Sequence, residues 1–202
     1  MCYNKEAQVH MADGTRKPVY LLQKGERVAT TTTAAGAGGS AGVVAVVEMY
    51  NAATGNVTTT FLFKDMCMLD DGFFISGTHP IRHGGRWIRP KWQFPCSRTL
   101  AFDSLFGLVL DAGHSVVIQG VEVATFVSKP VGVTLIDIPH KLKWYQAIAS
   151  SPGFEEGYVR IDARELAKLR PANWDGSVYD RLQFEEAVIT PAAGAFAAAS
   201  VM

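Results

Sequence analysis

The sequence predicts an all-β fold followed by a helical extension. Short runs of β-branched and aromatic residues recur between residues 9 and 126, and glycine-containing turns separate them. After about residue 140 the spacing of apolar residues changes to that of helices. We therefore expect an all-β core over residues 1–130, a mostly helical extension over 131–190 and a flexible tail over 191–202.

The β part is expected to consist largely of hairpins. Asp13-Gly14 is a strong signal for a tight hairpin turn, and Gln119-Gly120 separates two later apolar runs. Residues 31–42 are rich in Thr, Ala and Gly and predict a loop. The runs expected to form strands are Val9–Met11, Val19–Leu22, Val28–Thr30, Val43–Tyr50, Val57–Phe63, Met66–Leu69, Gly72–Ser76, Arg86–Ile88, Leu105–Leu110, Ser115–Ile118 and Val121–Phe126.

The extension carries three helix signals. Leu142–Ser150 and Ile161–Leu169 have helical spacing, and Pro171 ends the second of these segments. Asp180–Ile189 predicts a third, short helix. The residues from Thr190 onward are rich in Pro, Ala and Gly, so we expect them to fray.

Composition excludes several classes of protein. A hydrophobic content of 48% supports a buried core, and a formal net charge of zero gives no basic surface for nucleic acid. No apolar run approaches the roughly 18 residues of a membrane span, and no signal sequence is evident, so we expect no membrane partner. The three cysteines are scattered and form no CxxC pair. They predict reduced thiols, an intracellular setting and neither metal nor cofactor.

Cys2 is the first candidate for chemistry, because its thiolate could attack the peptide carbonyl just before it. Cleavage by this route also needs an oxyanion donor and a proton for the departing nitrogen. Ser76 and His79, in the segment Ser76-Gly-Thr-His-Pro80, supply a hydroxyl and an imidazole for these tasks. The alternatives are that Cys2 is an ordinary thiol and that His79 caps the end of a strand.

Three segments in chain order resemble the Hint (hedgehog/intein) family. They are Cys2 with Val9-His-Met-Ala-Asp-Gly-Thr15, the segment Ser76-Gly-Thr-His-Pro-Ile-Arg-His-Gly-Gly-Arg-Trp87, and Leu108-Val-Leu-Asp-Ala-Gly-His-Ser-Val-Val-Ile-Gln-Gly-Val-Glu-Val123. The residues of these segments are most similar to those of Vint, the Hint variety found beside von Willebrand factor type A domains. The resemblance implies a pseudo-symmetric all-β horseshoe in which the first cysteine, a Thr-x-x-His segment and the closing strand converge.

The resemblance also implies roles for individual residues. Cys2 matches the nucleophile, His79 the group that protonates the scissile nitrogen, and Ser76 the residue that polarises the scissile peptide. His114 matches a region where relatives carry a histidine, and it is equally consistent with a catalytic assistant and with a structural turn residue.

Three departures from the family pattern narrow the expected activity. Ser76 replaces Thr, Gly107 stands where relatives usually carry Asp or Asn, and Ala124-Thr125 replaces the terminal His-Asn of splicing inteins. Without that Asn we expect no splicing. We expect single-turnover cleavage before Cys2, by an N-to-S acyl shift and release of the thioester by water or another small nucleophile.

The expected partner is an upstream domain of the same precursor, such as a von Willebrand factor type A domain. Two alternative hypotheses for the function remain open. One is a weak or inactive Hint scaffold that binds a peptide or protein through the cleft that is catalytic in active Hint domains. The other is an unrelated all-β binding module.

Overall fold

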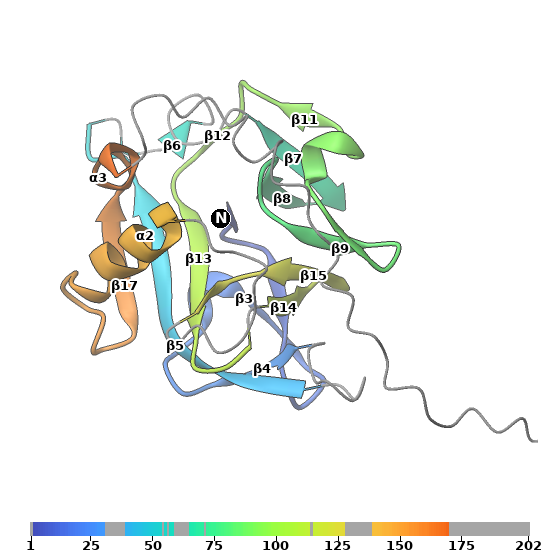
Figure 1. The fold of residues 1–202 in the computed structure, drawn as a ribbon, viewed down its shortest axis with the longest axis horizontal. Helices are drawn as coiled ribbons and strands as arrows, with labels where there is room; N and C mark the ends of the chain where they lie inside the picture. The colour runs from blue at the N-terminus through green and yellow to red at the C-terminus, as the bar shows by residue number, and fades with distance from the viewer. Residues whose placement is uncertain are drawn as a thin grey trace, which may run out of the picture.

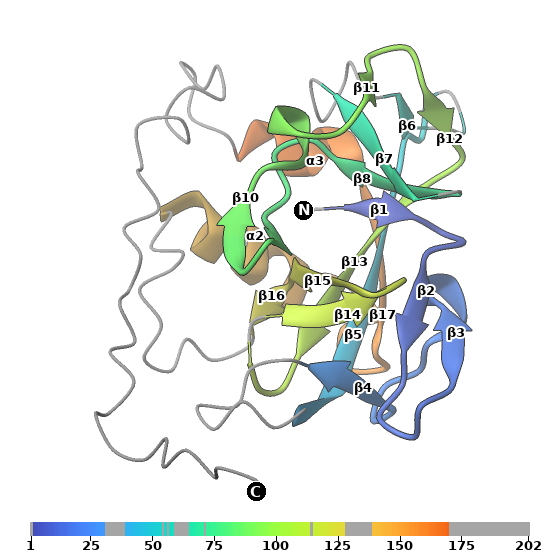
Figure 2. The same cartoon turned by 90° about the vertical axis from the view of Figure 1, so that its right-hand side faces the viewer.

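Two largely antiparallel sheets form the described part of the protein in the computed structural model (Figures 1 and 2). The structure describes residues 2–30, 39–53, 55, 57–58, 65–70, 72–113, 115–127 and 139–169. The larger sheet contains, in spatial order, β11 (Cys96–Ser97), β7 (Met66–Asp70), β8 (Phe73–Ser76), β1 (Tyr3–Asn4), β13 (Leu105–Leu110), β5 (Gly39–Tyr50) and β17 (Tyr158–Asp162), with β16 (Phe126–Val127) paired to β13 and β4 (Arg27–Thr30) paired to β5.

The remaining elements are shorter. The second sheet contains, in order, β10 (Arg86–Ile88), β9 (Ile81–His83), β15 (Val121–Ala124), β14 (Ser115–Ile118), β2 (Gln8–His10) and β3 (Arg16–Pro18). A separate two-stranded ribbon consists of β12 (Ala101–Phe102) and β6 (Val57–Thr58). The helical elements are α2 (Pro139–Ala149), α3 (Ala163–Lys168) and the single 3₁₀ turns η1 (Val19–Leu21) and η2 (Pro90–Trp92).

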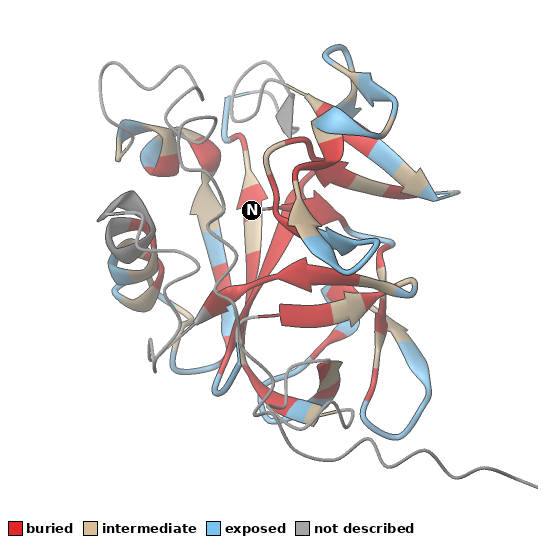
Figure 3. Ribbon diagram, turned by 45° about the vertical axis from the view of Figure 1, so that its right-hand side comes forward, coloured by how far each residue is buried: buried red, intermediate tan, exposed pale blue. Residues whose placement is uncertain are grey.

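The paired strands β5 and β13 separate two hydrophobic cores. Every residue of β13 is buried, and successive side chains alternate between the cores, as strand geometry requires. Phe106, Leu108 and Leu110 belong to the first core, whereas Leu105 and Val109 belong to the second. The two strands therefore lie inside the molecule with both faces covered, as their buried colouring shows (Figure 3).

The chain start enters the middle of the larger sheet. Tyr3 pairs with Phe106 of β13 on one side and with Ile75 of β8 on the other. The sequence did not predict β1, because two residues are too few to show an alternating pattern. Its position brings the first described residues against the end of β8.

Part of the C-terminal extension belongs to the larger sheet. β17 lies parallel to β5, in a register that runs from Tyr158 opposite Val46 to Asp162 opposite Tyr50. This strand corrects the prediction of a helix from Ile161 to Leu169. The helix α3 begins only at Ala163, because the Asp162 side chain caps it by accepting a hydrogen bond from the Arg164 backbone N–H.

The helices of the extension cover the second core. Trp144 and Ile148 of α2 and Leu166 of α3 are buried there. The expected helix over Leu142–Ser150 corresponds to α2, which begins three residues earlier, at Pro139. The predicted helix Asp180–Ile189 and the tail over 191–202 lie outside the described residues.

Several further sequence predictions are confirmed, and others need correction. Leu105–Leu110 and Ser115–Ile118 are strands with the expected bounds. The run Val19–Leu22 was expected to be a strand, but Val19–Leu21 forms the 3₁₀ turn η1. Its buried residues, Val19 and Leu22, are three apart, which is the period of such a turn. The predicted loop over 31–42 ends earlier, because β5 already begins at Gly39.

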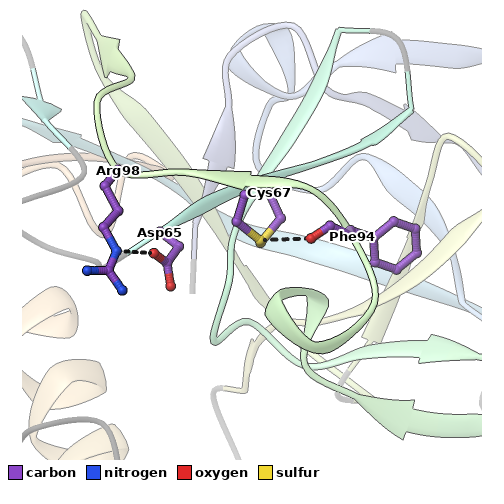
Figure 4. The surroundings of a disulfide bond; sticks show 5 residues. Asp65, Cys67, Phe94 and Arg98 are labelled. Atoms are coloured by element: carbon purple, nitrogen blue, oxygen red, sulfur yellow. Dashed lines mark hydrogen bonds and ion pairs between the residues drawn. A yellow bond between two sulfur atoms is a disulfide. The ribbon is translucent and has the colours of Figure 1, made fainter.

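The cysteines provide a further correction. Cys67 and Cys96 form a disulfide across the paired strands β7 and β11 (Figure 4). The prediction of reduced thiols is therefore wrong for these two residues. Their separation of 29 residues gave no sign of the pairing, since only the strand register brings them opposite each other. This finding removes the argument from thiols for an intracellular setting.

Candidate functional site

Two of the predicted site segments meet through their backbones. The Ser76 N–H donates a hydrogen bond of 2.9 Å to the carbonyl oxygen of Cys2. Ser76 is the last residue of β8, and the chain then turns tightly, with the His79 N–H donating to the Ser76 carbonyl oxygen at 2.8 Å. The Tyr3 and His79 rings lie 5.8 Å apart between centroids. The chain start therefore lies against the Ser-x-x-His turn.

The Cys2 side chain is a thiol outside any disulfide and is fully buried in the second core. Its Sγ donates a hydrogen bond to Sδ of Met49, on β5, at 3.2 Å. Tyr3 pairs with Phe106 and Asn4 with Leu105, so the same antiparallel register places Gly107 opposite Cys2. The position where relatives carry Asp or Asn thus lies beside the thiol, and glycine offers no side chain there.

The Ser76 hydroxyl is a buried polar group with no hydrogen-bond partner among the residues that the structure describes. The side chain is fully buried, and Oγ makes no hydrogen bond within the described residues. A buried hydroxyl in this state costs about 1–3 kcal/mol. Unpartnered groups of this kind call for an explanation, and a catalytic role is one of the recognised ones.

The His79 ring is held in a defined protonation pattern. The side chain is only 1% exposed, and its Nε2 lies 2.7 Å from the carbonyl oxygen of Ala124. A carbonyl can only accept, so in the neutral ring Nε2 carries the proton and Nδ1 has the lone pair. Nδ1 is therefore the nitrogen through which this imidazole can gain and deliver a proton.

The end of the closing strand completes the site. Ala124, the last residue of β15, accepts the His79 hydrogen bond and donates its own N–H to the Pro80 carbonyl oxygen at 3.0 Å. Thr125 follows it, is 3% exposed, and has a hydroxyl without a hydrogen-bond partner in the described part of the chain. The pair that replaces the intein terminus is therefore located beside His79.

Sequence reasoning missed two residues of the site. Met49 contacts the Cys2 thiol, but an apolar strand residue carries no sign of this role in the sequence. Tyr3 follows Cys2 and its ring lies near His79, and burial together with the charge of the neighbouring Cys2 raises the pKa of its phenol well above the usual value. A neutral phenol therefore stands next to the imidazole.

His114 lies outside the described residues, so its role stays a prediction. A zinc site made of His79, His83 and Cys96 would lack one ligand, because the Cys96 sulfur is bonded to Cys67. Within the residues that the structure describes, no group of three His, Cys, Asp or Glu side chains is arranged to hold a metal ion.

Comparison with protein families identifies the domain. A family model described as "Vint: Hint-domain" matches residues 1–134, about two thirds of the chain. The chain belongs to the Vint family of Hint domains. The match covers Cys2, Ser76, His79 and the closing strand, and it ends before α2. The mostly β architecture with few helices is the Hint fold that the sequence predicted.

Solved structures similar to this Vint chain are inteins. The Ssp DnaB mini-intein variant M86 is 15% identical, with a TM-score of 0.45, and the match covers 61% of this chain and 93% of that one. A DnaB intein from Synechocystis sp. PCC 6803 is also 15% identical, with a TM-score of 0.44 and coverage of 61% and 97%. No relative was found among curated proteins. In the described residues, no helix is long and apolar enough to cross a membrane.

Proposed function

We propose that this Vint domain cleaves the peptide bond that precedes Cys2, once per molecule, and thereby releases the segment upstream. The observation that carries the proposal is the convergence of three parts of the chain. The Cys2 carbonyl accepts from the Ser76 N–H, and His79 on the same turn bonds to Ala124 at the end of β15. The backbone segments that carry the proposed nucleophile, hydroxyl and proton donor are thus held together by these hydrogen bonds, and all three side chains are buried.

The first step is an N-to-S acyl shift. Cys2 Sγ gives up its proton and attacks the carbonyl carbon of the preceding residue, and the Ser76 hydroxyl donates to the oxyanion that forms. The C–N bond then breaks, and the Cys2 nitrogen takes a proton from Nδ1 of the protonated His79 ring to become an amine. A thioester now joins the upstream segment to Cys2.

Two features of the site favour a slow or conditional first step. The thiol starts in an apolar core and donates to Met49, so it must leave that contact before it can attack. Gly107, opposite Cys2, provides no side chain to assist its deprotonation.

The second step releases the upstream segment. Water or another small nucleophile attacks the thioester carbonyl, the C–S bond breaks, and the Cys2 thiol is restored with a proton. Thr125 follows the closing strand where a splicing intein has Asn, and a hydroxyl cannot cyclise to a succinimide. The proposed outcome is therefore cleavage rather than splicing.

The test is a fusion with a small reporter domain directly before Cys2. Mass spectrometry follows release of the reporter with and without hydroxylamine, which attacks thioesters. We expect hydroxylamine-dependent release at this bond, no release from Cys2→Ala, and a loss of about a hundredfold or more in His79→Ala. His83→Ala removes an exposed histidine from β9 and serves as the matched control with an unchanged rate.

The second candidate function is an inactive scaffold that binds a peptide or a partner protein. Two observations favour this scaffold function: Gly107 provides no side chain opposite Cys2, and the Cys2 thiol is hydrogen-bonded to Met49. An intact fusion from a folded protein after days in hydroxylamine supports the scaffold and contradicts self-cleavage.

A further inference from the structure

We propose that the Cys67–Cys96 disulfide positions the Ser76–His79 turn for peptide cleavage, so that its reduction slows the reaction. The inference rests on the proposed function. It assigns the disulfide a role in the chemistry, in addition to any effect on stability.

The backbone of the turn is held from two sides at Gly77. Its N–H donates to the Asp65 carbonyl oxygen at 2.9 Å, just before β7. Its carbonyl oxygen accepts from the Lys91 N–H, in the turn η2, at 3.1 Å. Gly77 lies directly between Ser76 and Thr78, so any displacement of these two supports moves the residues that flank it.

The disulfide packs against the same glycine. A side-chain Cβ on Gly77 would lie 3.0 Å from Cys67 Sγ and 3.1 Å from Lys91 Cβ. These distances are tighter than ordinary Cβ contacts, so a side chain at this position would require the disulfide or Lys91 to shift by a few tenths of an ångström. The sulfur therefore forms part of the wall that fixes where the turn lies.

Non-covalent contacts also hold this wall together in the described part of the chain. β11 pairs with β7 through only two residue pairs, Cys96 with Cys67 and Ser97 with Met66. The Met68 N–H also donates to the Pro95 carbonyl oxygen at 3.0 Å. An ion pair joins Arg98 to Asp65 at 3.0 Å, but the Arg98 side chain is 75% exposed, and such pairs contribute little.

The disulfide is thus the covalent link between β7 and the segment that carries η2. Figure 4 shows this link beside the Arg98–Asp65 pair. Reduction leaves the two segments with their short pairing, the Met68–Pro95 hydrogen bond and the exposed Arg98–Asp65 pair. Since a misplacement of about 1 Å can cost about a hundredfold in rate, loosening of this wall is expected to affect the Ser76 hydroxyl and the His79 ring.

The bond is accessible for exchange, because Cys96 is exposed while Cys67 is buried. A thiolate or a phosphine attacks the sulfur of Cys96, and Cys67 leaves as the thiolate. With a phosphine, one water supplies the oxygen of the phosphine oxide, and both cysteines end as thiols. With a low-molecular-weight thiol, two thiol equivalents become one disulfide.

The experiment separates reduction from thioester cleavage by the choice of reagents. A water-soluble phosphine reduces disulfides without releasing the reporter, and hydroxylamine releases the reporter without reducing disulfides. The reporter fusion is treated with hydroxylamine at increasing concentrations, with and without phosphine. At saturation the rate is that of the acyl shift, whereas at low concentration it also depends on attack at the thioester.

We expect phosphine to lower the rate of reporter release at saturating hydroxylamine by about tenfold or more. The measurement is made at a temperature where circular dichroism shows that the oxidised and the reduced protein are both folded. Reoxidation with oxidised glutathione should restore the rate. The double variant Cys67→Ala/Cys96→Ala should be slow and insensitive to phosphine. If the disulfide is purely structural, its reduction lowers the melting temperature but leaves unchanged the release rate of the folded protein at saturating hydroxylamine.

The two proposals fail in different ways. Release with hydroxylamine at an equal or higher rate in phosphine overturns the positioning role and leaves self-cleavage standing. A folded, oxidised fusion that never releases the reporter contradicts self-cleavage itself, and the positioning role falls with it.

Discussion

Two buried serines provide a sharp test of the site, because only one of them has a structural partner. Ser115 donates a 2.7 Å hydrogen bond to the Glu122 carboxylate, whereas the Ser76 hydroxyl has no partner among the described residues. Both side chains are fully buried. Substitution by alanine should therefore change the free energy of unfolding in opposite directions.

The size of each change in the free energy of unfolding depends on whether the hydroxyl makes a hydrogen bond in the folded state. Ser76→Ala removes an unpaired buried hydroxyl, which costs about 1–3 kcal/mol, and loses a smaller amount of dispersion contact. We expect a net gain of about 1 kcal/mol, which raises the melting temperature by roughly 2–4 °C for a chain of this size. Ser115→Ala removes a hydrogen bond to a charged group and should lose about 1.5–3 kcal/mol.

The assay is urea unfolding in a Cys2→Ala background, where cleavage cannot occur, paired with reporter release in the Cys2 protein. Ser76→Ala should be more stable and yet slower in release, by about a hundredfold if the hydroxyl holds the oxyanion. A loss of stability like that of Ser115→Ala would refute the reasoning, since Ser76 would then have a structural partner. An unchanged release rate would remove Ser76 from the mechanism.

Three further predictions concern the surroundings of the site. Gly77→Ala should lower the free energy of unfolding, measured in urea, by about 1–3 kcal/mol, because the new methyl group is overpacked against Cys67. The loss should be smaller in the Cys67→Ala/Cys96→Ala variant, and an equal loss in both proteins contradicts the contact. Ile148→Ala should cost about 2–5 kcal/mol if α2 packs as described, and a cost below about 0.5 kcal/mol argues that it does not. The hydrogen bond from Arg164 lowers the pKa of Asp162 below 3.8, so this cap stabilises the fold above that pH and loses its effect as the pH falls through the lower folded pKa. Thermal unfolding of Asp162→Ala should show a deficit of about 1 kcal/mol near neutral pH that shrinks in acid; a deficit independent of pH contradicts the charge effect.

The strands were predictable where their pattern was long enough. Leu105–Leu110 and Ser115–Ile118 are largely apolar runs, and turn residues follow each of them. β1 was missed because two residues carry no period. The last two residues of β17, from Ile161, were assigned to a helix because they directly precede α3. Val19–Leu22 was misassigned because an apolar run of four does not distinguish a strand from a 3₁₀ turn.

The candidate site was predictable in its members and not in its contacts. Cys2, Ser76 and His79 could be named because their residue types and order resemble a family. The Met49 thioether beside the thiol and the Cys67 sulfur against Gly77 come from strands distant in sequence. Neither carries a signal in the sequence, because any apolar or small residue is compatible with a buried strand.

The sequence by itself determined the all-β class, because that depends on local period. It also named Cys2 as the candidate nucleophile and showed Thr125 where the resemblance implies Asn, because these depend on residue type and order. The tertiary structure decided which groups meet. It placed Gly107 opposite the thiol, left the Ser76 hydroxyl unpartnered and joined Cys67 to Cys96. The physical reason is that strand register is set by how two cores pack on a shared sheet, and local sequence does not encode that register.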